Sequence, residues 1–160
     1  MIAPNLRVLF VGINPGVYST ARQHHFARPG NRFWPALASA GLTPHQLSPA
    51  EDRTLLSLGF GITNVVARTT ARADELSLDE LRAGARDLES KLRHFRPAVV
   101  AILGITAYRS AFDRPTASLG LQPDPLAGVR LFVLPNPSGL NAHHQLPALA
   151  RLFAEVIEPP

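Results

Sequence analysis

The stretch "RVLFVGINPG", from Arg7 to Gly16, decides how the chain is organised. An apolar run stops abruptly in Gly-Ile-Asn-Pro-Gly, and the same pattern returns late in the chain as "LFVLPNPSG", from Leu131 to Gly139. A short apolar run closed by turn-forming residues is typical of a buried strand that leads into a loop. The two Asn-Pro pairs therefore predict two buried strands, each followed by a loop rich in glycine and proline.

Further short apolar runs alternate with helical patterns along the chain. The clearest helix is preceded by a capping-box pattern of Ser77 and Glu80, and its apolar face holds Leu78, Leu81, Ala85, Leu88, Leu92 and Phe95. The expected strands cover residues 6–11, 60–66, 99–103 and 131–134, and the expected helices cover residues 31–40, 49–58, 78–95, 106–112 and 146–157.

Strands that are apolar throughout and alternate with helices predict an α/β fold, with a mostly parallel sheet that is covered on both faces. Ligands bind to such sheets outside the carboxyl ends of the strands. The expected ends read "GINPG", "GITN", "LGIT" and "PNPSG", and residues of these types suit loops that turn sharply and approach a ligand closely. The alternative is that glycine and proline only terminate the strands.

The composition is that of one globular domain over residues 1–160, with 46% hydrophobic and 18% charged residues. No apolar run approaches the roughly 20 residues of a membrane span, and the first residues do not resemble a signal peptide. We therefore expect a cytoplasmic protein with no membrane partner. The absence of cysteine excludes disulfides, thiolate nucleophiles and cysteine-bound zinc or iron–sulfur centres.

The charge favours an anionic partner such as a nucleic acid, since the net charge is +4 and the isoelectric point about 10.6. Arginine suits bidentate contacts with phosphate, and Lys91 is the only lysine among 16 basic residues. An arginine bias also arises from genome composition, and many basic proteins bind no nucleic acid. Charge alone leaves both alternatives open.

Asn14 is the candidate functional residue of the first motif. Gly12 and Gly16 allow the backbone to approach a ligand closely, and Pro15 restricts Asn14 to an extended conformation. The amide offers one acceptor and two hydrogens, so it can orient a water or hold a substrate carbonyl although it is no strong base. The loop is neither a Walker loop nor a complete dinucleotide fingerprint.

Two apolar residues in loop segments are candidate ligand contacts. Phe26, in "HHFARPGNRFW", lies away from any helical apolar stripe and is a candidate to stack on a nucleobase, unless it closes a small apolar cluster. Leu140, in "NPSGLNAHH", lies at the tip of a turn-rich loop. It is a candidate wedge that replaces an extruded base in a DNA stack, unless it packs back on the domain. Phe33 and Trp34 are expected in the core.

Metal binding is not expected. His143 and His144 are candidate metal ligands or phosphate contacts, but no third ligand is evident near them in the sequence. We therefore predict no metal site.

The motifs "GINPG", "FARPGNRFW" and "NPSGL", in this order, resemble those of the uracil-DNA glycosylase superfamily, and specifically its mismatch-specific uracil/thymine branch. The resemblance extends from Leu6 to about Phe153. It implies a three-layer α/β/α sandwich with a short, mostly parallel sheet. It also implies an enzyme of the bacterial nucleoid that flips mismatched uracil, and sometimes thymine, from double-stranded DNA and hydrolyses the N-glycosidic bond without a cofactor. We expect a monomer, because no coiled-coil or interface pattern is present.

By this resemblance, Asn14 positions the attacking water, Phe26 stacks on the flipped base, and Leu140 fills the gap while nearby backbone contacts the widowed guanine. A backbone N–H near Ile13 or Asn14 can stabilise the leaving base anion, and Ser19 is a candidate to hydrogen-bond the pyrimidine edge. The candidate substrate-binding residues are Gly12, Ile13, Pro15, Gly16, Ser19, Phe26, Asn64 and Asn136, and the candidate DNA-binding residues are Pro137, Ser138, Gly139, Leu140 and Asn141.

The motifs depart from those of the fastest uracil-cutting branches, which have an Asp after the first Gly-x and a His where Asn136 stands. The resemblance therefore implies slow turnover and a loosely selective pocket. Asp74 is a candidate general base that assists Asn14. The alternative is that Asp74 pairs with Arg68 or Arg72, or supports the helix that begins at residue 78.

Other functions compatible with the sequence are a nucleotide-binding α/β module without catalysis and a hydrolase of free nucleosides. The second would need to hold a ribose, and no acidic cluster follows the first strand. A serine hydrolase is disfavoured because the Gly-x-Ser-x-Gly elbow is missing.

Overall fold

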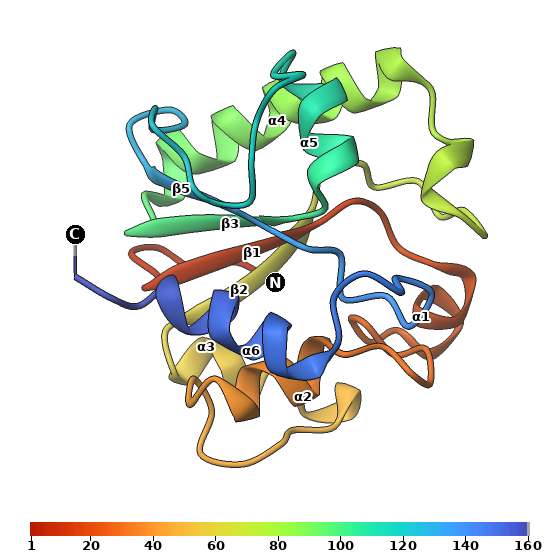
Figure 1. Cartoon of the computed structure of the whole chain (residues 1–160), viewed down its shortest axis with the longest axis vertical. Coiled ribbons are helices and arrows are strands. Elements are labelled where there is room, and N and C mark those ends of the chain that lie inside the picture. The colour runs from red at the N-terminus through yellow and green to blue at the C-terminus, as the bar shows by residue number, and fades with distance from the viewer. Residues whose placement is uncertain (160) are drawn as a thin grey trace.

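The fold is built on one five-stranded sheet, seen in a computed structural model that describes residues 1–159 (Figure 1). The strand order is β2-β1-β3-β5-β4; the first four strands are parallel, and β4 runs antiparallel to β5. The strands are β1 (Val8–Gly12), β2 (Phe60–Asn64), β3 (Val99–Leu103), β4 (Gly120–Leu121) and β5 (Arg130–Leu134). The predicted mostly parallel sheet is therefore confirmed.

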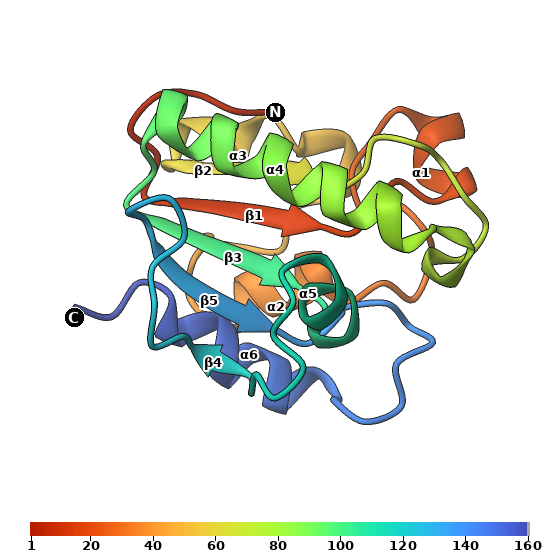
Figure 2. The ribbon, with the colours of Figure 1, turned by 90° about the horizontal axis from the view of Figure 1, so that it is seen from above.

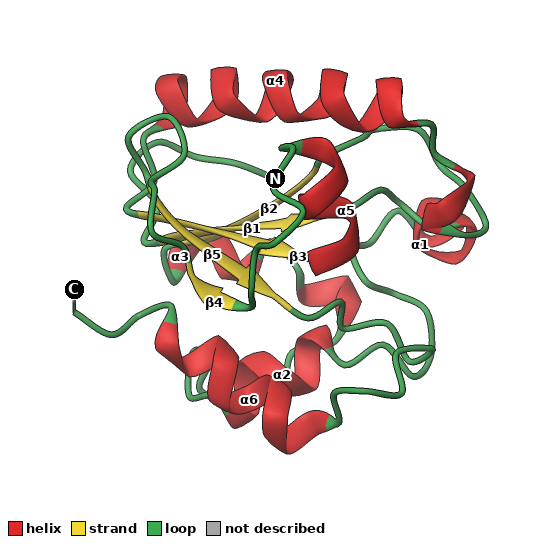
Figure 3. Ribbon diagram, turned by 45° about the horizontal axis from the view of Figure 1, so that its top comes forward, coloured by secondary structure: helices red, strands yellow, loops and turns green. Residues whose placement is uncertain are grey.

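Helices cover both faces of the sheet, which confirms the predicted three-layer α/β/α sandwich (Figure 3). Strand residues alternate between the layers: Val8 and Phe10 pack toward one face, Leu9 and Val11 toward the other. The helices of the first face are α2 (Phe33–Ser39), α3 (Thr54–Ser57) and α6 (Leu146–Glu155), and those of the second are α4 (Leu78–Phe95) and α5 (Ile105–Ala111).

The sequence predicted α4 and β3 with the bounds that the structure has. The capping box at the start of α4 is present, since Ser77 Oγ accepts from Glu80 N at 3.1 Å and Glu80 Oε2 accepts from Ser77 N at 2.8 Å. Leu78 was wrongly placed on the apolar face, because it is 45% exposed. The first turn of α4 lies past the end of β1, so the sheet does not cover it (Figure 2).

Three segments differ from the predicted elements. The helix expected over residues 49–58 is a 3-10 turn (Pro49–Glu51) followed by the short α3, because Asp52, Leu55 and Leu56 bond carbonyls only three positions back. Helix α1 (Val17–Arg22) was not predicted, since none of its residues is buried and it has no apolar stripe. Strand β4 has only two residues, too few for a recognisable alternation.

The parallel strands end level with one another, which brings the loops of all four to one edge of the sheet (Figure 2). Paired residues at this edge are Gly12 with Asn64 and Leu103 with Leu134. Both Asn-Pro motifs begin at this edge. Within residues 1–159, no helix is both long and apolar enough to cross a membrane.

Candidate active site

A cavity of about 660 Å³ opens at the carboxyl edge of the sheet, and we call it the base pocket. It lies between the loop after β1, helix α1, the segment around Phe26, residues 70–74 and the loop after β5. The structure brings most of the predicted site residues together there. They are Gly12, Ile13, Asn14, Pro15, Gly16, Ser19, Phe26, Asn64, Asp74, Asn136, Ser138, Leu140 and Asn141.

Pro137 and Gly139 do not line the base pocket. Pro137 is buried, and its carbonyl oxygen accepts a hydrogen bond from Arg32 N at 2.8 Å. Gly139 packs against the backbone of Gly30, where a Cβ would come within 2.7 Å of the Gly30 carbonyl oxygen. Their predicted contact with DNA stays a prediction, and in the structure both hold the loop in place.

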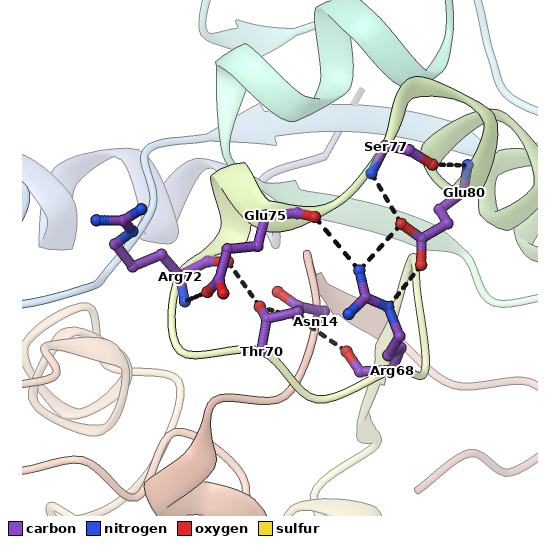
Figure 4. A network of polar contacts seen from close by, with 7 residues as sticks. All are labelled: Asn14, Arg68, Thr70, Arg72, Glu75, Ser77 and Glu80. Carbon is purple, nitrogen blue, oxygen red and sulfur yellow. Dashed lines mark hydrogen bonds and ion pairs between the residues drawn. The ribbon is translucent and has the colours of Figure 1, made fainter.

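The side-chain amide of Asn14 is held in one orientation (Figure 4). Its Nδ2 donates to the Arg68 carbonyl oxygen at 2.8 Å and to Thr70 Oγ1 at 2.7 Å. Thr70 Oγ1 donates in turn to the Arg72 carbonyl oxygen at 2.7 Å, so its own hydrogen is already used. Both partners of Nδ2 therefore act as acceptors, and a flipped amide would lose both bonds. Asn14 Oδ1 keeps its lone pairs free of any donor within residues 1–159.

An ion pair outside the pocket anchors the loop that holds Asn14 (Figure 4). Arg68 Nε lies 2.6 Å from Glu80 Oε1, and Arg68 Nη2 lies 3.1 Å from Glu80 Oε2, which is a bidentate contact. Arg68 Nη2 also donates to the Glu75 carbonyl oxygen at 3.3 Å. The loop from β2 to α4 is thus tied to the first turn of α4.

The Glu80 carboxylate stays ionised far into acid. Hydrogen bonds from Arg68, and then from the Ser77 backbone, lower its pKa from 4.5 to about 2. Because the folded-state pKa is depressed, the stability that this pair contributes is fully present above about pH 4.5 and is lost as the pH falls toward 2. The anchor of the Asn14 loop is therefore intact at neutral pH.

Gly12, Asn64 and Phe26 meet at the floor of the base pocket. A Cβ on Gly12 would lie 2.6 Å from Asn64 Oδ1 and 3.2 Å from Phe26 Cζ, so only glycine fits there. The Phe26 ring lies on Phe33, with centroids 4.2 Å apart and an interplanar angle of 30°. Phe26 therefore packs against the main core and not in a small cluster of its own, and it lines the pocket as well. Phe33 and Trp34 are buried, as predicted.

Ser19 lines the pocket and supports the neighbouring segment. Its Oγ accepts from Ala27 N at 3.0 Å, so the hydroxyl hydrogen remains available to a ligand. Helix α1, which carries Ser19, is attached to the loop after β2 by a contact of 2.7 Å between the hydroxyls of Thr20 and Thr69.

Asp74 lies at the rim of the pocket. Its side chain is 73% exposed, and its Oδ1 lies 3.1 Å from Arg72 Nε. The pairing with Arg72 is one of the alternatives that the sequence left open. The role of Asp74 as a general base stays a prediction.

The loop after β5 presents Leu140 to solvent. Asn136 Oδ1 accepts from Ser138 N at 3.0 Å, and Asn141 Nδ2 donates to the Asn136 carbonyl oxygen at 3.0 Å. Ser138 Oγ accepts from Leu140 N at 3.2 Å. Leu140 is 72% exposed, more than any other large apolar side chain in residues 1–159. The alternative that Leu140 packs back on the domain is wrong.

Sequence reasoning missed several residues of the pocket wall, among them Thr70 and His25. Thr70 is buried, and its contact with Asn14 spans 56 positions, so no local pattern indicates it. His25 lines the pocket. Burial lowers the pKa of His25 below the usual 6.5, and the positive charge of the nearby N-terminal amine lowers it further. The imidazole is therefore neutral at neutral pH.

A second cavity of about 580 Å³ adjoins the base pocket and shares Ile13, Ala73, Asp74, Asn136 and Asn141 with it. Its remaining wall is mostly apolar, and His143 and His144 lie at it. Within residues 1–159 no three His, Asp or Glu side chains are grouped so that they could hold a metal ion.

The base pocket thus combines an aromatic side chain, Phe26, with the oriented amide of Asn14, and the exposed Leu140 lies beside it. A family model described as the uracil DNA glycosylase superfamily matches residues 1–158. The match includes the whole sheet, the base pocket and the loop with Leu140. The chain therefore belongs to the uracil DNA glycosylase superfamily.

Proposed function

We propose that this chain excises uracil from mismatched double-stranded DNA, accepts thymine as a second base, and leaves an abasic site without cutting the strand. Membership of the superfamily supports the coarser statement, a uracil-DNA glycosylase-type hydrolase that acts on DNA. The observation that carries the proposal is the Asn14 amide. Its two hydrogens are bound by Arg68 and Thr70, so its oxygen is left as a free acceptor on a residue that lines the pocket.

In the proposed reaction, Asn14 Oδ1 accepts a hydrogen bond from a water and directs the water's oxygen toward C1′ of the nucleotide. The bond from C1′ to the base nitrogen breaks, and its electron pair leaves with the base. A bond from C1′ to the water oxygen forms, and the surplus proton passes to solvent because an amide does not take it. Backbone N–H groups near Ile13 stabilise the departing base anion.

A Cβ built on Gly16 meets no atom within 4 Å, so no neighbouring side chain closes the pocket lining at Gly16. This open lining is compatible with a base that carries a 5-methyl group. A mismatched base leaves the stack at lower cost than a paired one, which supports a preference for G:U over A:U.

The direct test is incubation of the protein with duplexes that contain G:U, A:U or G:T, followed by alkali and gel analysis. We expect strand cleavage after alkali in the order G:U, A:U, G:T, and intact strands when alkali is omitted. Duplexes that all remain intact at high protein concentration would contradict the proposal. Nucleotide binding without any abasic product would identify a non-catalytic binding module instead.

Glu80→Gln is expected to slow single-turnover uracil excision about tenfold, because the loop that orients Asn14 loses its charged anchor and small misplacements are costly in catalysis. Glu89→Gln is the matched control. Glu89 pairs with Arg93 on the same helix at 3.2 Å, away from the pocket, and its variant should cut at the wild-type rate. Equal rates for both variants would show that the Glu80 anchor does not serve Asn14.

Asp74→Ala is expected to keep the excision rate within about threefold of the wild type, because its carboxylate is exposed and paired with Arg72. Asp79→Ala, another exposed acid in the same region, controls for the change in net charge. A loss of about 10²-fold or more in Asp74→Ala alone would instead make Asp74 the general base.

A further inference from the structure

Arg32, at the start of α2, bonds the loop after β5 through both its backbone and its side chain. Its backbone N donates to the Pro137 carbonyl oxygen at 2.8 Å. Its Nη1 lies 3.3 Å from the Ser138 carbonyl oxygen, 2.9 Å from that of Asn141 and 3.3 Å from that of His144. One guanidinium nitrogen thus holds three carbonyls of residues 136–144, which we call the wedge loop.

The guanidinium of Arg32 has no carboxylate within 4 Å among residues 1–159. The hydrogen bonds of its guanidinium within these residues all go to backbone carbonyl oxygens, and the side chain is half-buried. A charged donor to a carbonyl makes a stronger hydrogen bond than a neutral one. The contact therefore serves to hold backbone.

The rest of the wedge loop is held mainly by short-range bonds. Asn141 N bonds the Ser138 carbonyl oxygen, and Asn136 and Asn141 bond each other. These contacts shape the turn but do not attach it to the domain. The attachment comes from Arg32 and from the close fit of Gly139 on the Gly30 backbone. Residues 30–32 thus form the part of the domain to which the loop with Leu140 is attached.

The same chain segment carries the aromatic floor of the base pocket. Phe26 lies six positions before Arg32, and Phe33 directly follows Arg32. The rings of Phe26 and Phe33 pack against each other. The spacing between the Phe26 ring and the tip of the wedge loop is therefore set within one short segment. A rigid spacing suits an enzyme that holds an extruded base and fills the vacated stack at once.

We propose that Arg32 is a positioning residue that holds Leu140 at the place where it enters the DNA stack. The proposal rests on the proposed function, because it assigns Leu140 the role of wedge. Loss of the Arg32 side chain removes the bonds to the carbonyls of Ser138, Asn141 and His144, so the loop must be ordered again at each encounter with DNA. The loss of excision rate therefore arises only with substrates in which a paired base has to leave the stack.

The test compares single-turnover uracil excision from a G:U duplex and from an unpaired uracil in a bulge. Arg32→Ala should lose about tenfold to hundredfold on the duplex and less than about threefold on the bulge, where little stacking opposes extrusion. Leu140→Ala should likewise lose activity on the duplex and not on the bulge. The double variant, with both Arg32→Ala and Leu140→Ala, should be no slower than Leu140→Ala alone. Arg32→Lys keeps the charge but lacks the reach of the guanidinium, so it should resemble Arg32→Ala.

Arg109→Ala is the matched control. Arg109 also bonds a backbone carbonyl, that of Ala117, at 2.9 and 2.6 Å, but away from the pocket, so its variant should be neutral on both substrates. Gly139→Ala tests the attachment of the loop to residues 30–32 without a change of charge, because a methyl group there meets the Gly30 carbonyl. It should slow excision from the duplex and leave excision from the bulge nearly unchanged. Equal losses of Arg32→Ala on duplex and bulge, or a wild-type rate for Arg32→Lys, would overturn the proposal.

Hydrogen–deuterium exchange of the free protein separates this inference from the proposed function. Arg32→Ala should speed amide exchange in residues 138–144 and leave that of β3 unchanged. Faster exchange in a protein that cuts no uracil substrate would leave Arg32 as the loop anchor and contradict only the proposed function. Unchanged exchange in the wedge loop would overturn the role of Arg32, whatever the wild-type activity.

Discussion

Asn14→Ala is expected to lower single-turnover uracil excision about 10²- to 10³-fold, which is the range for loss of one preorganised polar group at a reacting centre. The reason is geometric. Nδ2 is bound to Arg68 and Thr70, which leaves Oδ1 as a free acceptor on a residue that lines the base pocket. Alanine leaves the water without its acceptor and also removes two hydrogen bonds that hold the loop after β2.

Substitutions at Thr70 separate these two consequences. Thr70→Ser keeps the hydroxyl that accepts from Asn14 Nδ2, so we expect a rate within about threefold of the wild type. Thr70→Val has nearly the same shape but no hydroxyl, and we expect a loss of about tenfold because the amide is then oriented by Arg68 alone. Binding to uncut DNA should be similar in all three variants. An Asn14→Ala enzyme with the wild-type rate would remove Asn14 from the mechanism.

Gly84→Ala is expected to lower the free energy of unfolding by about 3 kcal/mol or more. Alanine normally stabilises a helix interior by about 1 kcal/mol relative to glycine. Here a methyl group would overlap the Val65 carbonyl oxygen, which is backbone and cannot rotate away. The steric cost therefore outweighs the gain in helix propensity, and the sign of the effect reverses.

Thermal unfolding measures this difference. For a chain of this size, about 3 kcal/mol corresponds to a fall in the melting temperature of roughly 6–12 °C. Ser90→Ala on the exposed side of the same helix is the control, and it should change stability by less than about 0.5 kcal/mol. A Gly84→Ala protein as stable as the wild type would mean that α4 can move away from β2 at little cost.

Much of the fold follows from local patterns. The apolar face and capping box of α4 repeat within 18 residues, and β3 is an uninterrupted apolar run, so both were predicted with their bounds. Helix α1 was missed because it buries no residue, and the two-residue β4 is too short to show alternation. Burial produces the patterns that sequence analysis detects, and elements that bury little leave none.

Sequence patterns and motifs were enough to predict the α/β class, the position of both Asn-Pro motifs at strand ends, and 13 of the residues that line the base pocket. The contacts that hold these residues are seen only in the folded chain. Asn14 is oriented by groups 54 and 56 positions away, and Arg32 bonds carbonyls 106 to 112 positions away. Hydropathy patterns record which residues are buried. They carry no information on backbone carbonyls, which every residue has and which become specific partners only where distant segments meet.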